Sequence, residues 1–487
     1  MNLPSDKLTP LDLVEQSEVR APSNPAIITT QKTISYRELL AQSRNAAHGI
    51  LKQTAGQEVV ALFFTMSAEF VAAYLATLFA GKRALPLNLL LPPEELLYIL
   101  KDSGAGSIIA PPELAPKIAP LGAKVFNWAE ICQPQADGAL PRPQPEDLCT
   151  LLYTSGTTGR PKGVCLTQWN LASNAKASVE MMHIAPDYRF LACLPTFHTF
   201  AITATILAPL AAGASLVPLP RFDPEGVLSA TANLQCNMLL MVPSMYRLMV
   251  RMQERKHFAI TLKLAISGGE PLPVEVRESF AKVFGVPLLE GYGQTEASPI
   301  ISFNMPWDSQ PGTVGKPLPN VRIQIADPNT GTVLPPGNNG EIWVQGPNIM
   351  RGYHNRPEET AQALAPGGWL RTGDMGTLTP EGFLKITGRL REMIKVGGEM
   401  VFPAEVENAL LLHPAVAEAG VAGAKDERKG EMVKAYVVLK TGQQATVDEL
   451  LTHCRNNLAA YKVPRVIEFR VELPKSPTGK VLRRLLK

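Results

Sequence analysis

Short apolar runs alternate with segments of helical periodicity between residues 8 and 290. Two amphipathic helices are predicted between residues 8 and 56, because apolar side chains recur there at helical spacing. Ser67 is placed to cap a further helix that ends near Gly81, and another helix is predicted over 93–102. The intervening apolar runs are typical of buried strands, at 59–64, 84–87 and 107–110. This alternation indicates a parallel sheet that is covered on both faces.

The same alternation continues in the next part of the chain. A largely apolar helix is predicted over 201–212, and strands are predicted at 148–153, 190–194, 215–217, 238–242, 262–266 and 287–290. The pattern is that of a doubly wound sheet, in which ligands bind at the carboxyl ends of strands. The proline-rich stretch 133–146 is interpreted as a surface linker between two lobes.

The pattern changes after residue 311. Short strands with Pro and Gly turns predict a small β-rich subdomain, at 322–325, 341–344 and 383–386. Mixed strands and helices follow over 391–487, including a helix whose capping box is formed by Thr446 and Glu449. The predicted fold class is therefore α/β, with a large N-terminal domain of doubly wound sheets, a small β-rich subdomain, and a small α+β C-terminal domain.

The loop after the strand at 148–153 has the composition of a triphosphate clamp. Glycines let backbone N–H groups turn toward an anion, hydroxyls add donors, and a lysine balances phosphate charge. The loop carries all three kinds of residue: Thr154, Ser155, Gly156, Thr157, Thr158, Gly159 and Lys162. It is not a Walker A motif, because Pro161 stands where that motif has glycine. A polar surface loop is the alternative on this stretch alone.

Composition narrows the class of protein. The 487 residues carry a net charge of +3 and no basic stripe, so a nucleic-acid partner is not expected. The six cysteines show neither zinc-site spacing nor a disulfide framework. There is no signal-peptide pattern and no apolar run of about 18 residues. We expect a cytoplasmic enzyme without a membrane span; peripheral membrane contact and a monomeric or homodimeric state stay open.

The loop and several later stretches resemble one known family. The order Y-T-S-G-T-T-G-R-P-K-G at 153–163 resembles the phosphate loop of the adenylate-forming superfamily, which contains acyl-CoA synthetases, adenylation domains and luciferases. Other stretches resemble the same superfamily in the expected order, namely G-G-E-P-L at 268–272, G-Y-G-Q-T-E at 291–296, W-L-R-T-G-D at 369–374 and P-K-S-P-T-G-K at 474–480. Together they cover nearly the whole chain.

The resemblance implies a site for ATP and Mg²⁺ with named residues. It implies that Thr295 contacts the α-phosphate, that Glu296 and Thr154 hold Mg²⁺, and that Asp374 accepts from the ribose hydroxyls. Arg389 would reach the ribose or a phosphate. The other nucleotide-binding residues that it implies are the loop residues named above with Gly268, Gly269, Glu270, Gly291, Tyr292 and Gly293. For coenzyme A it implies a pantetheine tunnel formed with Lys395, Gly397 and Gly398, although Met400 stands where asparagine is more usual.

The resemblance also implies a moving domain that delivers a lysine. The implied division is an AMP-binding domain over 1–388, a hinge over 389–391 and a mobile C-terminal domain over 392–487. Arg391 stands at the hinge position, where Asp or Lys is common in the family. Lys480 matches the family's catalytic lysine, which enters the site when the small domain closes. The implied catalytic residues are Lys480, Thr295, Glu296, Lys162 and His198.

The stretch 195–200 resembles the acyl-pocket segment of the family, with His198 at the pocket entrance. Residues 201–206 are uncharged, whereas amino-acid-activating domains usually place an aspartate there, so a fatty or aryl carboxylic acid is favoured. The main hypothesis is a ligase of medium- or long-chain fatty acids to coenzyme A. An acyl-AMP or carrier-protein ligase, an aryl acid–CoA ligase, a luciferase-like oxygenase and a non-catalytic nucleotide-binding protein are the alternatives.

Overall fold

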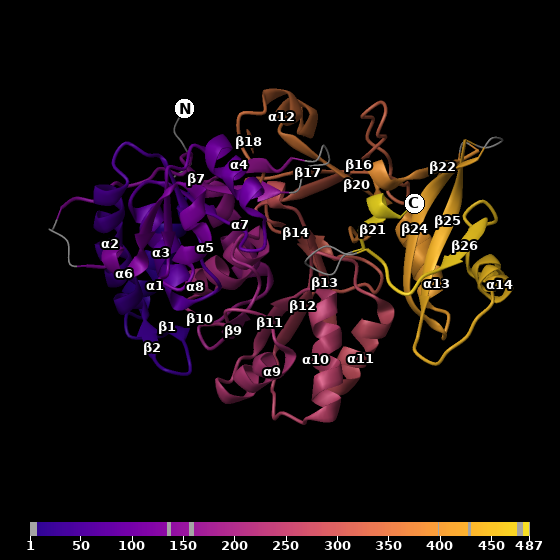
Figure 1. Ribbon diagram of the computed structural model, residues 1–487, viewed down its shortest axis with the longest axis horizontal. Helices are drawn as coiled ribbons and strands as arrows, with labels where there is room; N and C mark the ends of the chain where they lie inside the picture. Colours follow the sequence, from indigo (N-terminus) through magenta and orange to yellow (C-terminus); the bar gives the residue numbers. More distant parts are fainter. Residues whose placement is uncertain are drawn as a thin grey trace. The chain divides into compact units, whose positions relative to one another are not determined.

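The computed structural model describes residues 7–133, 138–154, 160–397, 399–426, 430–474 and 481–486. The chain forms two compact units, Met1–Ile323 with Val344–Arg371 and Gln324–Trp343 with Thr372–Lys487. It crosses between them inside three strands labelled in Figure 1, β16 (Arg322–Ala326), β17 (Gly340–Gln345) and β20 (Trp369–Leu378). These strands share a sheet with β19 (Leu364–Ala365) and β21 (Leu384–Arg389). The predicted domain division is defined by a hinge about which one domain moves, whereas the two compact units are defined by packing. The predicted division therefore stays a prediction.

The larger sheet of the first unit positions the candidate site. Its described strands follow the order β15-β14-β13-β12-β11-β9-β10-β1-β2. The strands from β13 to β1 in this order run parallel, and β14, β15 and β2 are antiparallel additions at the two edges. Their bounds are β1 Pro25–Ile28, β2 Thr33–Ser35, β9 Arg189–Ala192, β10 Ser215–Pro218, β11 Met238–Met241, β12 Leu264–Ser267, β13 Leu288–Gly293, β14 Ile300–Phe303 and β15 Lys316–Pro317.

A second sheet of the same unit carries the phosphate-loop hairpin. Its order among the described strands is β18-β8-β7-β4-β3-β5-β6, with β7 and β8 antiparallel and β7 to β6 parallel. The bounds are β3 Val59–Leu62, β4 Arg83–Pro86, β5 Ser107–Ala110, β6 Lys124–Asn127, β7 Leu148–Thr154, β8 Lys162–Thr167 and β18 Gly352–Tyr353.

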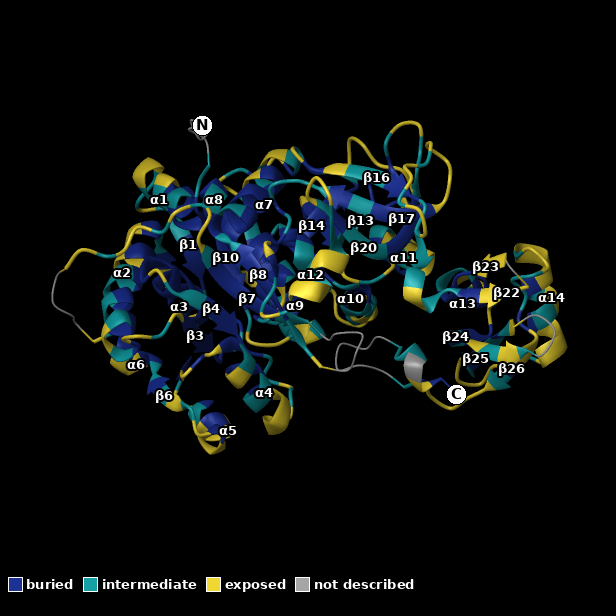
Figure 2. Ribbon diagram, turned by 90° about the horizontal axis from the view of Figure 1, so that it is seen from above, coloured by how far each residue is buried: buried dark blue, intermediate teal, exposed yellow. Residues whose placement is uncertain are grey.

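Helices cover both sheets, as the alternating pattern predicts. Side chains of α9 (Pro224–Asn233), α10 (Pro243–Arg255) and α11 (Val274–Phe284) form one apolar cluster with the larger sheet, whereas α4 (Pro93–Ser103) packs on the second. Helix α3 (Ala68–Phe79) is buried along almost its whole length (Figure 2), and Ser67 caps it as predicted. The remaining helices of this unit are α1 Pro10–Arg20, α2 Tyr36–Gln53, α5 Ala115–Ile118, α6 Trp128–Ile131, α7 Gln168–Met181, α8 Ala208–Ala212 and α12 Pro357–Ala363.

The C-terminal part of the second unit is an α+β structure with its own apolar core. Its sheet has the order β23-β22-β25-β24, with β26 beside β25. The predicted capping box of Thr446 and Glu449 is present at the start of α14. The elements are β22 Ile394–Val396, β23 Glu399–Val401, α13 Pro403–Leu411, β24 Val416–Asp426, β25 Gly430–Leu439, α14 Val447–Asn457 and β26 Val466–Phe469.

The α/β fold class is confirmed, two strands were missed, and two local predictions are wrong. The short strands β1 and β2 lie between the first two helices, where the sequence pattern gave no strand signal. The stretch 133–146 does not separate two lobes, because β6 before it and β7 after it belong to the same sheet. The segment predicted as one helix over 201–212 begins as a π-helix, η2 (Phe200–Leu207), before α8. Among the described residues, no helix is long and apolar enough to cross a membrane.

Candidate active site

Glycines at the ends of β12 and β13 allow unusually close packing. The two strands are parallel neighbours, so the turn that follows β12 lies beside the end of β13. Gly269 in that turn has a φ of +81°, a left-handed conformation that favours glycine. In β13, a Cβ atom on Gly291 would lie 2.4 Å from Cδ1 of Phe303, the residue opposite it on β14. The two glycine motifs are therefore required by local geometry.

These glycines line an apolar cavity of about 60 Å³. It contains five of the predicted nucleotide-binding residues, and the complete lining is Phe200, Ile266, Ser267, Gly268, Gly269, Gly291, Tyr292, Gly293, Pro299, Ile300 and Phe303. Ser267 Oγ is buried and has no hydrogen-bond partner within the described part of the chain. Burying a hydroxyl without a partner costs free energy, so this atom is suited to a polar atom of a ligand. Glu270 is half-buried in the turn that follows.

The residues after β13 lie in a short 3₁₀ turn, η3 (Thr295–Ala297). Thr199 Oγ1 donates a hydrogen bond to Thr295 Oγ1 at 3.2 Å, and Tyr353 OH donates to Glu296 Oε1 at 2.8 Å. Lys162 Nζ lies 5.3 Å from the centre of the Tyr353 ring. The structure thus brings Lys162 and Glu296 to one aromatic side chain.

The β7–β8 hairpin positions Lys162. Thr154 and Lys162 are direct cross-strand partners at the loop end of this hairpin, so they flank the predicted phosphate loop. Lys162 Nζ lies 3.9 Å from a carboxylate oxygen of Glu359, and its side chain is only 16% exposed. A positive charge is therefore held at the base of the loop.

Within the second unit, Asp374 and Arg389 are paired. They are cross-strand partners on β20 and β21, and Arg389 Nε lies 3.1 Å from Asp374 Oδ1. The two predicted ribose contacts therefore act on each other. Lys395 and Gly397 are exposed in the β22–β23 hairpin, where Gly397 has a φ of +62°.

His198 lies in the loop before η2 and is not among the residues that line the cavity. The residue is exposed to solvent at the surface of the first unit. The protein around it nevertheless lowers the pKa of His198 below the usual histidine value by desolvation, so the ring is neutral at pH 7. A neutral ring can accept or donate a hydrogen bond but adds no positive charge to the site. The predicted place of His198 at the acyl-pocket entrance stays a prediction.

Several predicted residues lie outside the described part of the chain, and their roles stay predictions. They are Ser155, Gly156, Thr157, Thr158, Gly159, Gly398 and Lys480.

Sequence reasoning missed three polar side chains of this region. Thr199 directly follows His198 in the stretch 195–200, which resembles the acyl-pocket segment. Its place in that stretch could therefore have identified it. Tyr353 contacts Glu296 across 57 residues of chain, and Ser267 is an ordinary strand residue by pattern. Neither of these two carried a local signal.

The donor set fits a Mg²⁺ ion that arrives together with a nucleotide. Across the described ranges, no group of three or more His, Cys, Asp or Glu side chains is arranged to hold a metal. Mg²⁺ is commonly bound by one or two carboxylates together with substrate phosphates and water. The single carboxylate of Glu296, beside the Thr295 hydroxyl, matches that mode.

Comparisons with known proteins identify the family. Residues 14–354 match the AMP-binding enzyme model, and residues 405–480 match the AMP-binding enzyme C-terminal domain. The chain is 34% identical to the long-chain-fatty-acid–CoA ligase of Bacillus subtilis (strain 168), over 99% of this chain and 95% of that protein. It is 38% identical to a feruloyl-CoA synthase of an Amycolatopsis species, over 84% of this chain and 85% of that protein.

A solved structure agrees with this result. The fold is similar to that of an O-succinylbenzoate coenzyme A synthetase from Bacillus subtilis in complex with ATP and magnesium ion, with a TM-score of 0.88 and 33% identity. The match covers 97% of this chain and 98% of that one. The fold and the glycine-lined site define the class of adenylate-forming enzymes. The chain belongs to the AMP-binding enzyme family, among relatives that are AMP-forming acid–CoA ligases.

Proposed function

We propose that the protein is an ATP-dependent ligase that joins a fatty carboxylic acid to coenzyme A. The acid carboxylate attacks the α-phosphorus of ATP, which gives an acyl-adenylate and releases pyrophosphate. The thiol of coenzyme A then attacks the acyl carbonyl, and AMP leaves. The observation that carries this proposal is the apolar cavity at the ends of β12 and β13, because β13 leads directly into the turn that holds Thr295 and Glu296.

The first step joins two anions that repel each other until positive charge intervenes. Lys162, held at the base of the phosphate loop, and Lys480 supply that charge, and the Thr295 hydroxyl donates toward the α-phosphate. Mg²⁺ bound at Glu296 would neutralise charge on the phosphates. Transfer at phosphorus depends mainly on positioning and electrostatics, so no nucleophilic side chain is needed.

The nature of the acid is inferred from η2, whose first residue, Phe200, lines the cavity. Residues 201–207 of η2 are apolar or hydroxylated and all buried, so no side chain there can pair with a substrate ammonium group. Burial of an alkyl chain against such walls is favourable by about 25 cal/mol per Å² of apolar surface. The similarity to the long-chain-fatty-acid–CoA ligase over almost the whole chain supports a fatty acid.

An aryl acid is the second candidate, because two aromatic side chains line the cavity. Phe200 and Phe303 both line it, and Phe303 occupies the space that Gly291 leaves open. Planar rings stack favourably on such walls. The similarity to the feruloyl-CoA synthase is in keeping with this candidate. A phosphopantetheine arm on a carrier protein offers the same thiol as coenzyme A and is the alternative acceptor.

The two half-reactions need different catalytic groups, so we also propose that the C-terminal domain moves between them. Residues 392–487 would rotate about Arg391, which withdraws Lys480 after adenylation and brings the hairpin of Lys395 and Gly397 to the thiol.

The test is acid-dependent AMP release, measured with and without coenzyme A across saturated fatty acids, aryl acids and amino acids. Turnover that requires coenzyme A and favours C8 to C16 acids is expected. Preference for aryl acids would replace the fatty acid by the second candidate. Adenylate formation that does not respond to coenzyme A would indicate a carrier-protein acceptor, and no AMP release with any acid would contradict the proposal.

A further inference from the structure

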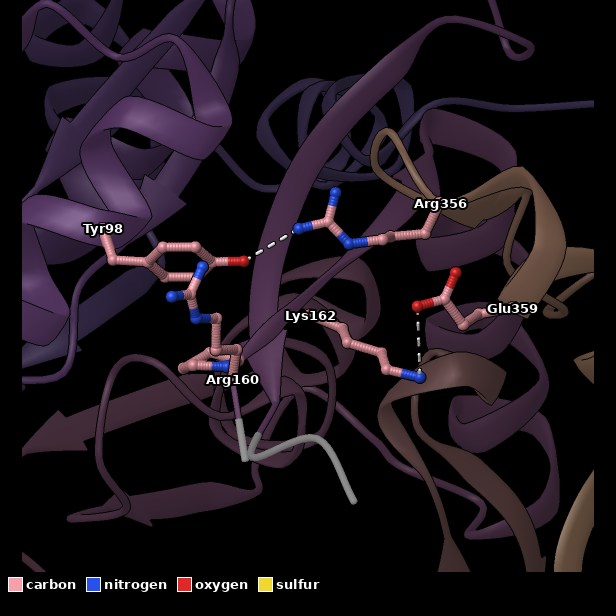
Figure 3. Close-up of a pocket in the computed structure, with 6 residues that line it drawn as sticks. Tyr98, Arg160, Lys162, Arg356 and Glu359 are labelled. Carbon is pink, nitrogen blue, oxygen red and sulfur yellow. Dashed lines mark hydrogen bonds and ion pairs between the residues drawn. The ribbon is translucent and has the colours of Figure 1, made fainter. Parts of the chain in front are cut away.

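A second pocket of the first unit carries an excess of positive charge. Its volume is about 230 Å³, and it is lined by Tyr98, Arg160, Pro161, Lys162, Arg356 and Glu359 (Figure 3). The lining comes from α4, from the start of β8 with the two residues before it, and from α12 with the residue before it. Three cationic side chains thus share a pocket whose lining includes one carboxylate.

The guanidinium of Arg356 is held in a fixed position. It donates to Tyr98 OH at 2.8 Å and to Asp102 Oδ1 at 2.9 Å. The other oxygen of Asp102 accepts from Tyr153 OH at 2.7 Å. Both carboxylate oxygens of Asp102 therefore already accept hydrogen bonds. Asp102 holds Arg356 in its orientation, and it does not act as a further carboxylate of the pocket beside Glu359.

The positive charge of the other two cations is not neutralised to the same degree. Arg160 lies over the Tyr98 ring at 5.6 Å and forms no ion pair within the described part of the chain. Lys162 is 3.9 Å from Glu359, well beyond the roughly 2.7–2.9 Å of a charge-assisted hydrogen bond. An arginine pre-positioned on an aromatic ring is well suited to a phosphate group, because its planar fork matches two phosphate oxygens.

We propose that this pocket is a subsite for inorganic pyrophosphate, with Arg160 and Arg356 as its recognition residues. It would receive the pyrophosphate that leaves in the adenylation step, and to that extent the proposal rests on the proposed function. Lys162 belongs both to this pocket and to the predicted triphosphate site, because it lines the pocket and also flanks the triphosphate loop. The volume lies below the roughly 300–1,000 Å³ of pockets for drug-sized ligands, which favours a small anion over a whole nucleotide.

The carboxylate of Glu359 lowers the affinity of the subsite for pyrophosphate. This carboxylate faces the same pocket as the three cations, so it repels an entering anion. A product subsite benefits from this arrangement, because pyrophosphate must leave before the next turnover. Removing Arg160 should therefore lower the affinity for pyrophosphate, whereas neutralising Glu359 should raise it. A purely structural role of the pocket would not produce effects of opposite sign.

The experiment is calorimetric titration of sodium pyrophosphate into the full-length protein without acid or coenzyme A. Arg160→Met is expected to weaken pyrophosphate binding about tenfold, as loss of a charge-assisted contact does. Glu359→Gln is expected to tighten it. Arg251→Met is the matched control on α10, which lies apart from α4 and α12 in Figure 1, and should leave binding unchanged. Equal affinities of the Arg160 and Arg251 variants would overturn the proposal.

The phosphates of coenzyme A offer the same chemistry, so coenzyme A is titrated in a second arm. Weaker coenzyme A binding with unchanged pyrophosphate binding in Arg160→Met would overturn the proposal in favour of that source. Because the titration needs no turnover, it is independent of the activity test. An inactive protein with the expected binding pattern would contradict only the proposed function, whereas an active protein without the pattern would contradict only the subsite.

Discussion

Tyr353 donates a hydrogen bond of 2.8 Å to the carboxylate of Glu296, and the ammonium of Lys162 lies 5.3 Å from the centre of the same ring. Burial raises the pKa of Tyr353, so the phenol keeps its proton and remains a donor. One aromatic side chain thus holds the predicted magnesium ligand and contacts the predicted phosphate-binding lysine.

Replacing Tyr353 by phenylalanine should raise the Mg²⁺ concentration that the reaction needs. The variant keeps the ring but frees the Glu296 carboxylate to rotate, and loss of such a supporting hydrogen bond typically costs 10–100-fold in metal affinity. The measurement is the Mg²⁺ concentration that gives half-maximal AMP release. Tyr188→Phe is the control for loss of a phenol elsewhere. An unchanged Mg²⁺ requirement in Tyr353→Phe would show that the hydrogen bond does not position Glu296.

Lys480→Ala should abolish most adenylation and spare the second half-reaction. Loss of a positioned transition-state charge costs on the order of 10²- to 10³-fold in rate. Thioester formation from a supplied acyl-adenylate should stay close to that of the unmodified protein, because the proposed rotation withdraws Lys480 from the site before that step. Lys440→Ala, an exposed lysine of the same unit, is the control. Equal losses in both half-reactions would contradict the role given to Lys480.

Arg391→Pro should uncouple the two half-reactions. Arg391 lies in a 3₁₀ turn, η4 (Leu390–Glu392), and a fixed φ would restrict the backbone rotation that a hinge needs. One half-reaction should persist while the other falls, because a fixed hinge holds the domain in one of its two positions. Arg391→Lys keeps the charge and the rotation and should behave like the unmodified protein. Unchanged rates of both half-reactions in the proline variant would contradict the assignment of Arg391 as the hinge residue.

Glu290 should make stability depend on pH. Burial raises its pKa to about 7, although the Leu272 N–H donates to it at 3.0 Å. The folded state therefore binds this proton more tightly than the unfolded state, whose carboxyl has a pKa near 4.3, and stability falls as pH rises between these values. Glu290→Gln should remove this loss and gain about 4 kcal/mol at pH 8.

The check is urea denaturation of both proteins at pH 4 and pH 8. The gain of Glu290→Gln should be present at pH 8 and absent at pH 4, since the unmodified side chain is protonated there in the folded state. Glu278→Gln, at an exposed position of α11, should show no such difference. An equal effect of Glu290→Gln at both pH values would rule out the shifted carboxyl as its cause.

Arg483 should be critical for the stability of the second unit. Its guanidinium forms a bidentate pair with Glu407, with bonds of 2.8 and 2.6 Å, and also pairs with Glu392. Glu407 is 8% exposed, so Arg483→Met would leave an uncompensated buried carboxylate. The free energy of unfolding of this unit should fall by about 3–5 kcal/mol, measured by hydrogen exchange in β24 and β25. The exposed Arg455→Met should change it little, and an equally small change in Arg483→Met would contradict the prediction.

The sequence predicted the parts of the molecule that depend on local pattern. Apolar runs marked the buried strands, and the paired glycines after β12 and within β13 marked the cavity. Within β13, a Cβ atom at Gly291 or Gly293 would lie less than 2.5 Å from a neighbouring atom, so glycine is required there. It did not predict pairings across long stretches of chain. Asp374 was assigned to the ribose and Arg389 to the ribose or a phosphate, but their direct pairing depends on the register of two strands, which neither motif encodes. Tyr353 was missed for the same reason.

The π-helix that begins at Phe200 has an evolutionary consequence. A π-helical turn holds one residue more than an α-helical turn, and such turns occur frequently at functional sites. Deleting one residue within Phe200–Leu207 would restore α-helical winding and rotate Phe200 relative to α8. The Phe200 side of the glycine-lined cavity would then change position without any change in the side chains around it. Loss of a single codon in this segment would therefore reshape the cavity through a change in helical winding alone.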